Sequence, residues 1–241
     1  MLIRILKTIK NSLITKKYSE LRFWQHEIQQ YQKWFNGELP QLYKTRSPLS
    51  INIVLTENIK DSSILTWHKL HQEPKYLNDL ELSPNAFEGM TLLDIGSGPM
   101  PSATCFKGSR LYCLDPLLPQ YLESGFPLHY YENVHFIHGS SEHIPIKNNF
   151  FDAVISVNAI DHVDNLMDTS KEIKRVLKMD GLFRMHVHYH PPTKCEPNSI
   201  DDNLFLNLFN WCNNLKKIKV SQNSFSIELP IGESFVLWSN F

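Results

Sequence analysis

Two acids and two glycines are the residues whose types and spacing most clearly indicate a binding site. They lie within or directly after short apolar segments. Asp94 lies in the segment 91–95, and Gly96 and Gly98 come directly after it. Glycines at such a turn let a ligand approach the backbone without a Cβ in the way. Asp115 stands nineteen positions after Gly96, at the end of the next apolar segment. An acid at that distance can accept both hydroxyls of a ribose, so the spacing predicts a nucleotide-binding site.

The residue at position 101 argues against a dinucleotide cofactor. In the pattern GxGxxG, Pro101 takes the place of the last small residue, which lets the helix pack closely on the strand. The sequence therefore disfavours hydride transfer with NAD. Pro99 and Pro101 are expected in the loop and in the first turn of a following helix.

Histidines supply the candidate catalytic bases, because their pKa lies near neutrality. The predicted candidates are His162, after one expected strand, and His188 and His190, at alternate positions of another. Alternate residues of a strand share a face, and His186 belongs to the same row. For His162, the alternative is a residue that only shapes its loop.

Three explanations of the histidine row remain open. In the first, His186 is a hydrogen-bonded core residue and only His190 approaches the ligand, since unpaired imidazoles in a dry core are costly. In the second, His188 or His190 acts as a base or binds the substrate. In the third, the row binds a metal ion together with Asp161, Cys195 or Glu196. The first is favoured, and no metal ligand is predicted.

Alternating strands and helices must position these residues. Strands are expected at 91–95, 110–114, 134–138, 151–157 and 182–190, and a helix at 165–180. This alternation with short loops predicts a parallel sheet that helices cover on both faces. A helix at 201–213 and strands at 216–229 and 234–241 follow, and Gly232 between the strands indicates a hairpin.

The N-terminal part of the chain has a helical pattern without catalytic spacing. Helices are expected around 2–13, at 19–36 and at 61–72, the last capped by Asp61. We therefore divide the chain into a helical cap, residues 1–84, and a ligand-binding domain, residues 85–241. The cap is expected to cover the ligand and to shape the substrate pocket.

Four segments resemble the successive motifs of class I S-adenosylmethionine-dependent methyltransferases, nearest to the methyltransferase type 11 subgroup. They are LLDIGSGP, CLDP, FIHGSSEHIPIKNNFFDAVISVNAIDHVDN and EIKRVLKMDGLFRMHVHYH. The resemblance covers residues 87–190, and the C-terminus by pattern only. It implies an α/β, doubly wound, Rossmann-like sheet of seven strands, mostly parallel with the last strand antiparallel. It also implies S-adenosylmethionine as the cofactor.

Roles carry over by position from this resemblance. The glycine loop and the acid before it would hold the methionine end of the cofactor, and Asp115 its ribose. The turn 139–142 would lie along the adenine, and Asn158 under the sulfonium. The cofactor-binding set is Asp94, Gly96, Ser97, Gly98, Asp115, Pro116, Ser141, Glu142 and Asn158.

Three positions depart from the family pattern. Met100 replaces a third glycine, and the segment 178–181 replaces a Lys-Pro-Gly-Gly turn, with its glycine expected to end a helix. Ser140 stands where many members have an adenine-contacting aspartate. The hydrogen bond to adenine is then weaker or comes from Ser141 or Glu142.

The composition of the chain indicates its general class and argues against nucleic acid as a partner. With 42% hydrophobic and 20% charged residues the chain is expected to be globular, and a formal charge of −1 gives no field that steers it to nucleic acid. Four cysteines without CxxC spacing indicate reduced thiols and a cytoplasmic protein. No run is long enough to span a membrane.

The first seventeen residues interleave basic and apolar side chains. This pattern is typical of a helix on an anionic membrane surface, and equally of one docked on its own domain or on a twin subunit. Docking is the favoured explanation. Peripheral membrane contact is the alternative, and the oligomeric state stays open.

The predicted function is methyl transfer from S-adenosylmethionine to a small or medium-sized acceptor. A hydroxyl is favoured because histidines outnumber other bases around the site, and a saccharide or lipid-linked saccharide would suit the aromatic cap. One alternative is a non-catalytic module that only binds the cofactor. A nucleic-acid or protein methyltransferase is disfavoured, since SVNAIDH stands where base amino-methylases have an NPPY-like motif.

Overall fold

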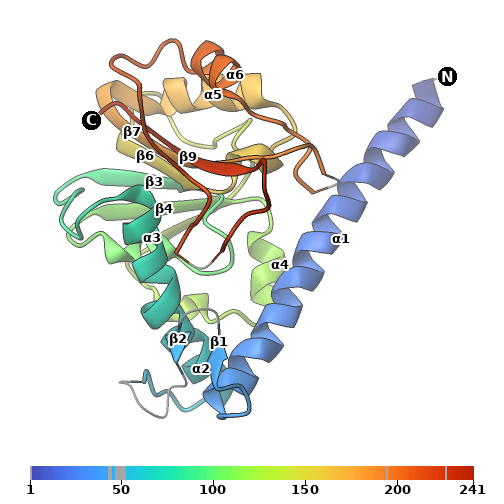
Figure 1. Cartoon of the computed structure of the whole chain (residues 1–241), viewed down its shortest axis with the longest axis vertical. Helices are drawn as coiled ribbons and strands as arrows, with labels where there is room; N and C mark the ends of the chain where they lie inside the picture. Colours follow the sequence, from blue (N-terminus) through green and yellow to red (C-terminus); the bar gives the residue numbers. More distant parts are fainter. Residues whose placement is uncertain (1, 43–44, 47–52, 194, 226) are drawn as a thin grey trace.

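A seven-stranded sheet forms the centre of the computed structural model, which describes residues 2–42, 45–46, 53–193, 195–225 and 227–241, with side chains of 2–18 and 45–46 outside the description (Figure 1). The strands are β3 (Thr91–Ile95), β4 (Arg110–Asp115), β5 (His135–His138), β6 (Phe151–Val157), β7 (Leu177–Tyr189), β8 (Lys216–Ser221) and β9 (Ser234–Ser239). Their order is β5-β4-β3-β6-β7-β9-β8, and β9 runs antiparallel to both of its neighbours. The predicted doubly wound, Rossmann-like sheet is confirmed.

Helices cover the two faces of this sheet. The helices α5 (Leu166–Val176) and α6 (Asp202–Leu208) lie on one face, and α3 (Glu73–Leu80) lies on the other (Figure 1). Each face has its own apolar core, one centred on Phe183 and Phe205 and the other on Leu92 and Phe87, all fully buried. Burial on both faces explains why the central strands are continuous apolar runs.

The N-terminal region shares a third core with the sheet domain. Its elements are α1 (Leu2–Phe35), the hairpin β1 (Gln41–Leu42) and β2 (Thr45–Arg46), α2 (Ile59–Trp67) and the π-helical turn His68–Gln72, which continues into α3. Tyr31 and Trp34 of α1 pack with Trp67 against Tyr121 of α4 (Leu118–Glu123). Tyr31 and Trp67 stack with ring centroids 4.1 Å apart. No helix in the described part of the chain has the length and apolar character needed to cross a bilayer.

Two N-terminal predictions are wrong in detail. A single helix replaces the two expected at 2–13 and 19–36, because the residues between them do not interrupt it. The helix expected from Asp61 begins at Ile59, since the side chain of Asn58 accepts a hydrogen bond from Lys60 N at 2.9 Å and caps it.

The helix expected after the glycine loop is also shorter than predicted. Only a 3₁₀ helix, Ser102–Cys105, follows β3. Pro101 has φ −77° and ψ 72°, which is outside the helical range, so the loop is longer and the helix starts after it. Two further 3₁₀ turns, Leu128–Tyr130 and Ile160–His162, follow α4 and β6.

The boundaries around β7 and β8 differ for tertiary reasons. The helix expected at 165–180 ends at Val176, and 178–181 belong to β7, so the glycine does not end a helix. Leu177 already pairs with Phe151, which draws the chain into the sheet. The strand expected at 216–229 stops at Ser221, because the following loop turns to Asp79, whose Oδ1 accepts from Phe225 N at 3.1 Å.

Candidate functional site

A cavity of about 800 Å³ opens at the carboxyl ends of β3, β4 and β6. This edge is where ligands bind in open α/β sheets. Side chains of α1, α2 and the turn after it also line the cavity, so the N-terminal region and the sheet enclose one space. Eight predicted cofactor residues line it: Gly96, Ser97, Gly98, Asp115, Pro116, Ser141, Glu142 and Asn158.

The glycine loop forms a tight turn against the neighbouring strand. Gly96 and Gly98 both have φ +68°, a conformation that favours glycine. Gly96 N donates to Leu114 O at 2.8 Å. A Cβ added at Gly96 would lie 2.3 Å from the Cβ of Ala159, so no side chain fits there. The loop can therefore bring backbone N–H groups close to a ligand.

Asp115 holds this loop from the end of β4. One carboxylate oxygen accepts from Gly98 N at 2.9 Å, and the other accepts from Leu117 N at 2.8 Å. The pKa of Asp115 is raised to about 7, mainly by burial and also by the nearby carboxylate of Glu20 on α1. The two backbone hydrogen bonds lower this pKa and so oppose the rise. Each oxygen keeps a second lone pair, which suits the two hydroxyls of a ribose.

Asp94 occupies a different environment from Asp115. Its side chain is fully buried in β3, and it does not line the cavity. Burial raises its pKa well above the usual range, and the hydroxyl of Tyr76 opposes this rise. Its predicted contact with the cofactor therefore rests on the family resemblance alone.

The histidine candidates separate into exposed and buried positions. His162 and His188 line the cavity, whereas the side chain of His190 is only 2% exposed. His188 Nε2 lies 2.9 Å from Glu233 Oε2. His190 Nε2 lies 3.2 Å from Asp161 Oδ2, and this hydrogen bond raises the pKa of His190 to about 9.

His186 is a hydrogen-bonded core residue, as the favoured explanation expected, but the expectation that only His190 approaches the ligand is wrong, because His188 lines the cavity and His190 does not. Its Nδ1 lies 2.8 Å from Asn158 Oδ1, and its ring stacks on Phe235 with centroids 4.9 Å apart. Burial lowers its pKa to about 4, so the ring is neutral at physiological pH. The same hydrogen bond fixes Asn158, whose φ is +51°, at the cavity wall.

Comparisons with known proteins agree with this geometry. Residues 93–185 match the model of a methyltransferase domain family. This segment of the chain carries a methyltransferase domain. It is 37% identical over 60 residues to the uncharacterized methyltransferase YcgJ of Bacillus subtilis, which is 25% of this chain, and it spans about a quarter (24%) of that relative's length.

Solved structures show the same fold at low sequence identity. The crystal structure of YcgJ has 16% identity and a TM-score of 0.52, covering 70% of this chain and 97% of that one. A geranyl diphosphate methyltransferase in complex with S-adenosylmethionine has 16% identity and a TM-score of 0.52, covering 77% and 91%. The cofactor implied for this domain is S-adenosylmethionine, and the glycine turn and the lone pairs of Asp115 fit it.

The turn 139–142 has a structural function that the sequence did not indicate. Glu142 Oε1 accepts from Asp164 N at 2.7 Å and from Asn165 N at 3.1 Å, and so fixes the start of α5. Ser141 Oγ shares a hydrogen bond of 2.9 Å with Thr169 Oγ1. Both residues still line the cavity.

Several cavity residues were missed because nothing in their spacing marks them. Glu20 and Phe23 of α1 line the cavity, as does His71 of the π-helical turn. In the sequence they are part of an amphipathic helical pattern. Only the packing of α1 against the domain shows that one turn of this helix faces the glycine loop.

Proposed function

We propose that this protein transfers the methyl group of S-adenosylmethionine to a hydroxyl of a small or medium-sized acceptor. The observation that carries the proposal is that one cavity joins the glycine loop and Asp115 to two histidines, His162 and His188. A cofactor bound at the glycine loop and Asp115 leaves the part of the cavity near the two histidines free for the acceptor. Cavities of this size accommodate such ligands.

Methyl transfer from S-adenosylmethionine does not need a covalent intermediate with the protein. The methyl group sits on a sulfonium, which is already a strong electrophile, so alignment of acceptor, methyl and sulfur supplies much of the rate. A hydroxyl acceptor also has to lose its proton, for which general-base catalysis is typically worth about 10²–10⁴-fold.

The lining of the cavity supports a saccharide or lipid-linked saccharide as the acceptor. Phe23 and Trp24 contribute aromatic surface from α1. The other aromatic side chains of this region, Tyr31, Trp34, Phe35 and Trp67, are buried in the core instead. The aromatic groups available to a sugar face are therefore those at the cavity wall.

Transfer of labelled methyl tests this function. Purified protein is incubated with methyl-labelled S-adenosylmethionine and fractionated cell extract, and label is expected in a small-molecule or lipid-linked saccharide fraction. Cofactor binding without transfer to any fraction would favour the alternative, a module that only binds the cofactor. Transfer to nucleic acid, with retention on heparin at moderate salt, would contradict the proposed acceptor class.

His162→Gln is expected to lower kcat about 10²–10⁴-fold while cofactor affinity stays within twofold, because this ring lines the cavity and the variant can no longer accept a proton there. The side chain of His162 is 30% exposed, and its Nε2 lies 3.7 Å from Glu196 Oε1. Steady-state kinetics and calorimetry separate the two effects. The matched control is His135→Gln. His135 is an exposed histidine at the start of β5, whereas the cavity lies at the carboxyl ends of the strands. Equal kinetics for both variants would exclude His162 as the base.

The N-terminal end of α1 is proposed as the contact with an anionic membrane that carries a lipid-linked acceptor. The basic and apolar side chains of residues 1–17 lie outside the described part, but α1 is one helix whose N-terminal end extends away from the sheet (Figure 1). Salt-sensitive sedimentation with anionic vesicles is expected for the whole chain and not after removal of residues 1–17. Equal sedimentation, or loss of cofactor binding on truncation, would assign this segment to the folded body instead.

A further inference from the structure

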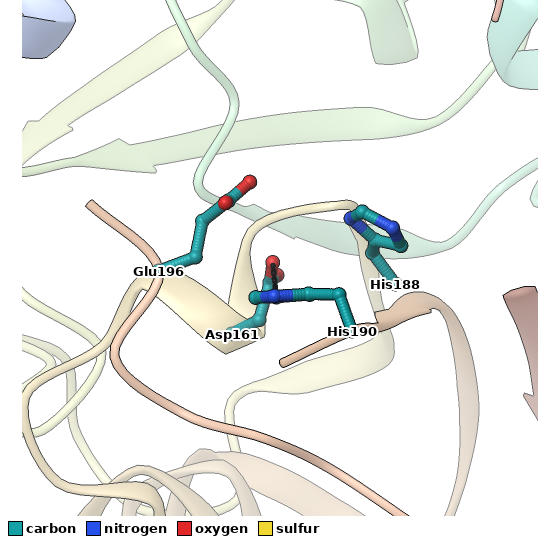
Figure 2. A group of neighbouring side chains, drawn as sticks. All are labelled: Asp161, His188, His190 and Glu196. Atoms are coloured by element: carbon teal, nitrogen blue, oxygen red, sulfur yellow. Dashed lines mark hydrogen bonds and ion pairs between the residues drawn. The ribbon is translucent and has the colours of Figure 1, made fainter. Parts of the chain in front are cut away.

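Four side chains converge beside the cavity, and three of them line it. We propose that Asp161, His188, His190 and Glu196 bind one divalent transition-metal cation, with Zn²⁺ as the representative ion. Each offers one ligand atom, and these atoms all lie within 4.8 Å of one another (Figure 2). Around Zn²⁺, with bonds of about 2.0–2.2 Å, ligand atoms are about 3–4 Å apart, so small side-chain movements close the site.

Three different segments bring the four ligands together. Asp161 lies in the 3₁₀ turn after β6, and His188 and His190 lie at and just after the end of β7, two positions apart on one face. Glu196 comes from the following loop, and Figure 2 shows Glu196 and His188 on either side of Asp161 and His190. The site is thus at the carboxyl edge of two neighbouring parallel strands.

The loop that carries Glu196 is tied down. Glu196 N donates to Thr193 Oγ1 at 3.0 Å, and Thr193 N donates to Glu196 O at 2.9 Å. Asn198 Nδ2 donates to the backbone oxygens of Asp161 at 3.1 Å and of Val163 at 2.6 Å. Hydrogen bonds therefore fix the fourth ligand relative to the first before any ion arrives.

The second nitrogen of each ring already has the partner that metal-bound histidines need. His190 Nδ1 lies 2.6 Å from Pro191 O, and a carbonyl only accepts, so Nδ1 carries a hydrogen. Nε2 now donates to Asp161 Oδ2, and a bound cation would take the place of this second hydrogen after its release as a proton. His188 Nε2 donates to the carboxylate of Glu233 at 2.9 Å, which leaves Nδ1 available. Such second hydrogen bonds orient the ring and raise its basicity as a ligand.

The carboxyl group of Asp161 independently indicates a cation. Its side chain is 1% exposed, and Oδ2 accepts from His190. Within the described part of the chain, Oδ1 has no hydrogen-bond partner and is inaccessible to solvent. A buried carboxylate oxygen without a partner is costly, and a bound cation would compensate it.

The donor set decides which cation fits. Two imidazoles with two carboxylates suit zinc and its neighbours in the transition series, whereas Mg²⁺ and Ca²⁺ prefer oxygen ligands alone. Cys195, considered from the sequence as a ligand, is not among the four. Asp161, His188 and Glu196 also line the cavity. If the proposed function holds, the cation would bind the acceptor oxygen there and favour loss of its proton, a step that rests on that function.

Metal content tests the site without any assay of activity. The full chain, purified without a histidine tag and treated with chelator, is titrated with ZnCl₂ by calorimetry and then measured by elemental analysis. One Zn²⁺ per chain is expected. His188→Ala and Glu196→Gln should each weaken binding at least about tenfold, and Glu233→Ala by about tenfold through loss of the second hydrogen bond.

Exposed residues of the same types provide the controls. His129→Ala and Glu132→Gln, both at the surface, should keep full Zn²⁺ affinity. Absence of stoichiometric binding, or equal weakening in the control variants, would overturn the site. Calorimetry with S-adenosylmethionine on each variant shows whether the proposed cofactor site at the glycine loop and Asp115 is intact. Zn²⁺ binding by a chain that does not bind S-adenosylmethionine would refute the proposed function and leave the metal site standing.

Discussion

Asp115→Ala is expected to lower the affinity for S-adenosylmethionine at least about 100-fold. Two ribose hydroxyls lose a charged acceptor, and each charge-assisted hydrogen bond is worth about 1.5–3 kcal/mol. The variant also leaves Gly98 N and Leu117 N without the carboxylate that now accepts from both. The loop therefore loses its support together with the ligand contact. Isothermal titration calorimetry measures the effect.

Two controls separate these contributions. Asp115→Asn keeps one acceptor oxygen at this position but removes the charge. Its affinity for S-adenosylmethionine should therefore lie between those of the wild type and of Asp115→Ala. Asp152→Asn, at the opposite end of the sheet, alters an acid that likewise accepts from a backbone N–H, that of Thr91 at 2.9 Å, and should leave affinity unchanged. In the wild type, affinity should rise as pH increases through about 7, where Asp115 ionises, and Asp115→Asn should abolish this rise. Unchanged affinity in Asp115→Ala would refute the ribose assignment.

Gly96→Ala is expected to destabilise the fold by about 2–5 kcal/mol and to abolish cofactor binding. A left-handed conformation costs a residue with a Cβ about 1–2 kcal/mol, and overpacking adds about 1–3 kcal/mol. The added Cβ would meet the Cβ of Ala159 at 2.3 Å, so either the loop or the segment after β6 has to move. Both segments line the cavity. Thermal unfolding and calorimetry report the two losses.

Gly89 offers a matched control for the backbone term. It has φ +75°, and a Cβ added there would meet nothing within 4 Å. Gly89→Ala should therefore cost only the left-handed strain and should leave cofactor binding intact. Adding Ala159→Gly to Gly96→Ala should restore part of the lost stability, because it removes the clashing atom. Equal destabilisation by the two alanine variants, with no rescue, would show that the close approach has no energetic weight.

The central strands could be predicted from sequence because their physical cause is local. The segments 91–95 and 151–157 are apolar runs buried on both faces, and their predicted bounds are those of β3 and β6. The glycine turn and Asp115 were predictable for the same reason, since sequence spacing fixes where a strand ends. The structure brings these predicted residues to a single edge of the sheet.

What the sequence could not reveal depends on contacts between distant segments. The pairing of Leu177 with Phe151 ends α5 early, although the helical pattern continues beyond it. The hydrogen bond from His188 to Glu233 joins residues forty-five positions apart, and no local pattern marks it. Periodicity placed the histidines on one face, but only tertiary structure shows which nitrogen of each ring remains available.

A crystal structure with bound S-adenosylhomocysteine, the product of the cofactor, tests the central claim most directly. The account predicts that the ribose hydroxyls lie within hydrogen-bond distance of Asp115, with the adenine along the turn 139–142. The sulfur should then face the part of the cavity lined by His162 and His188. A product molecule bound elsewhere, or one whose sulfur faces away from these histidines, would contradict the assignment of this cavity as a methyl-transfer site.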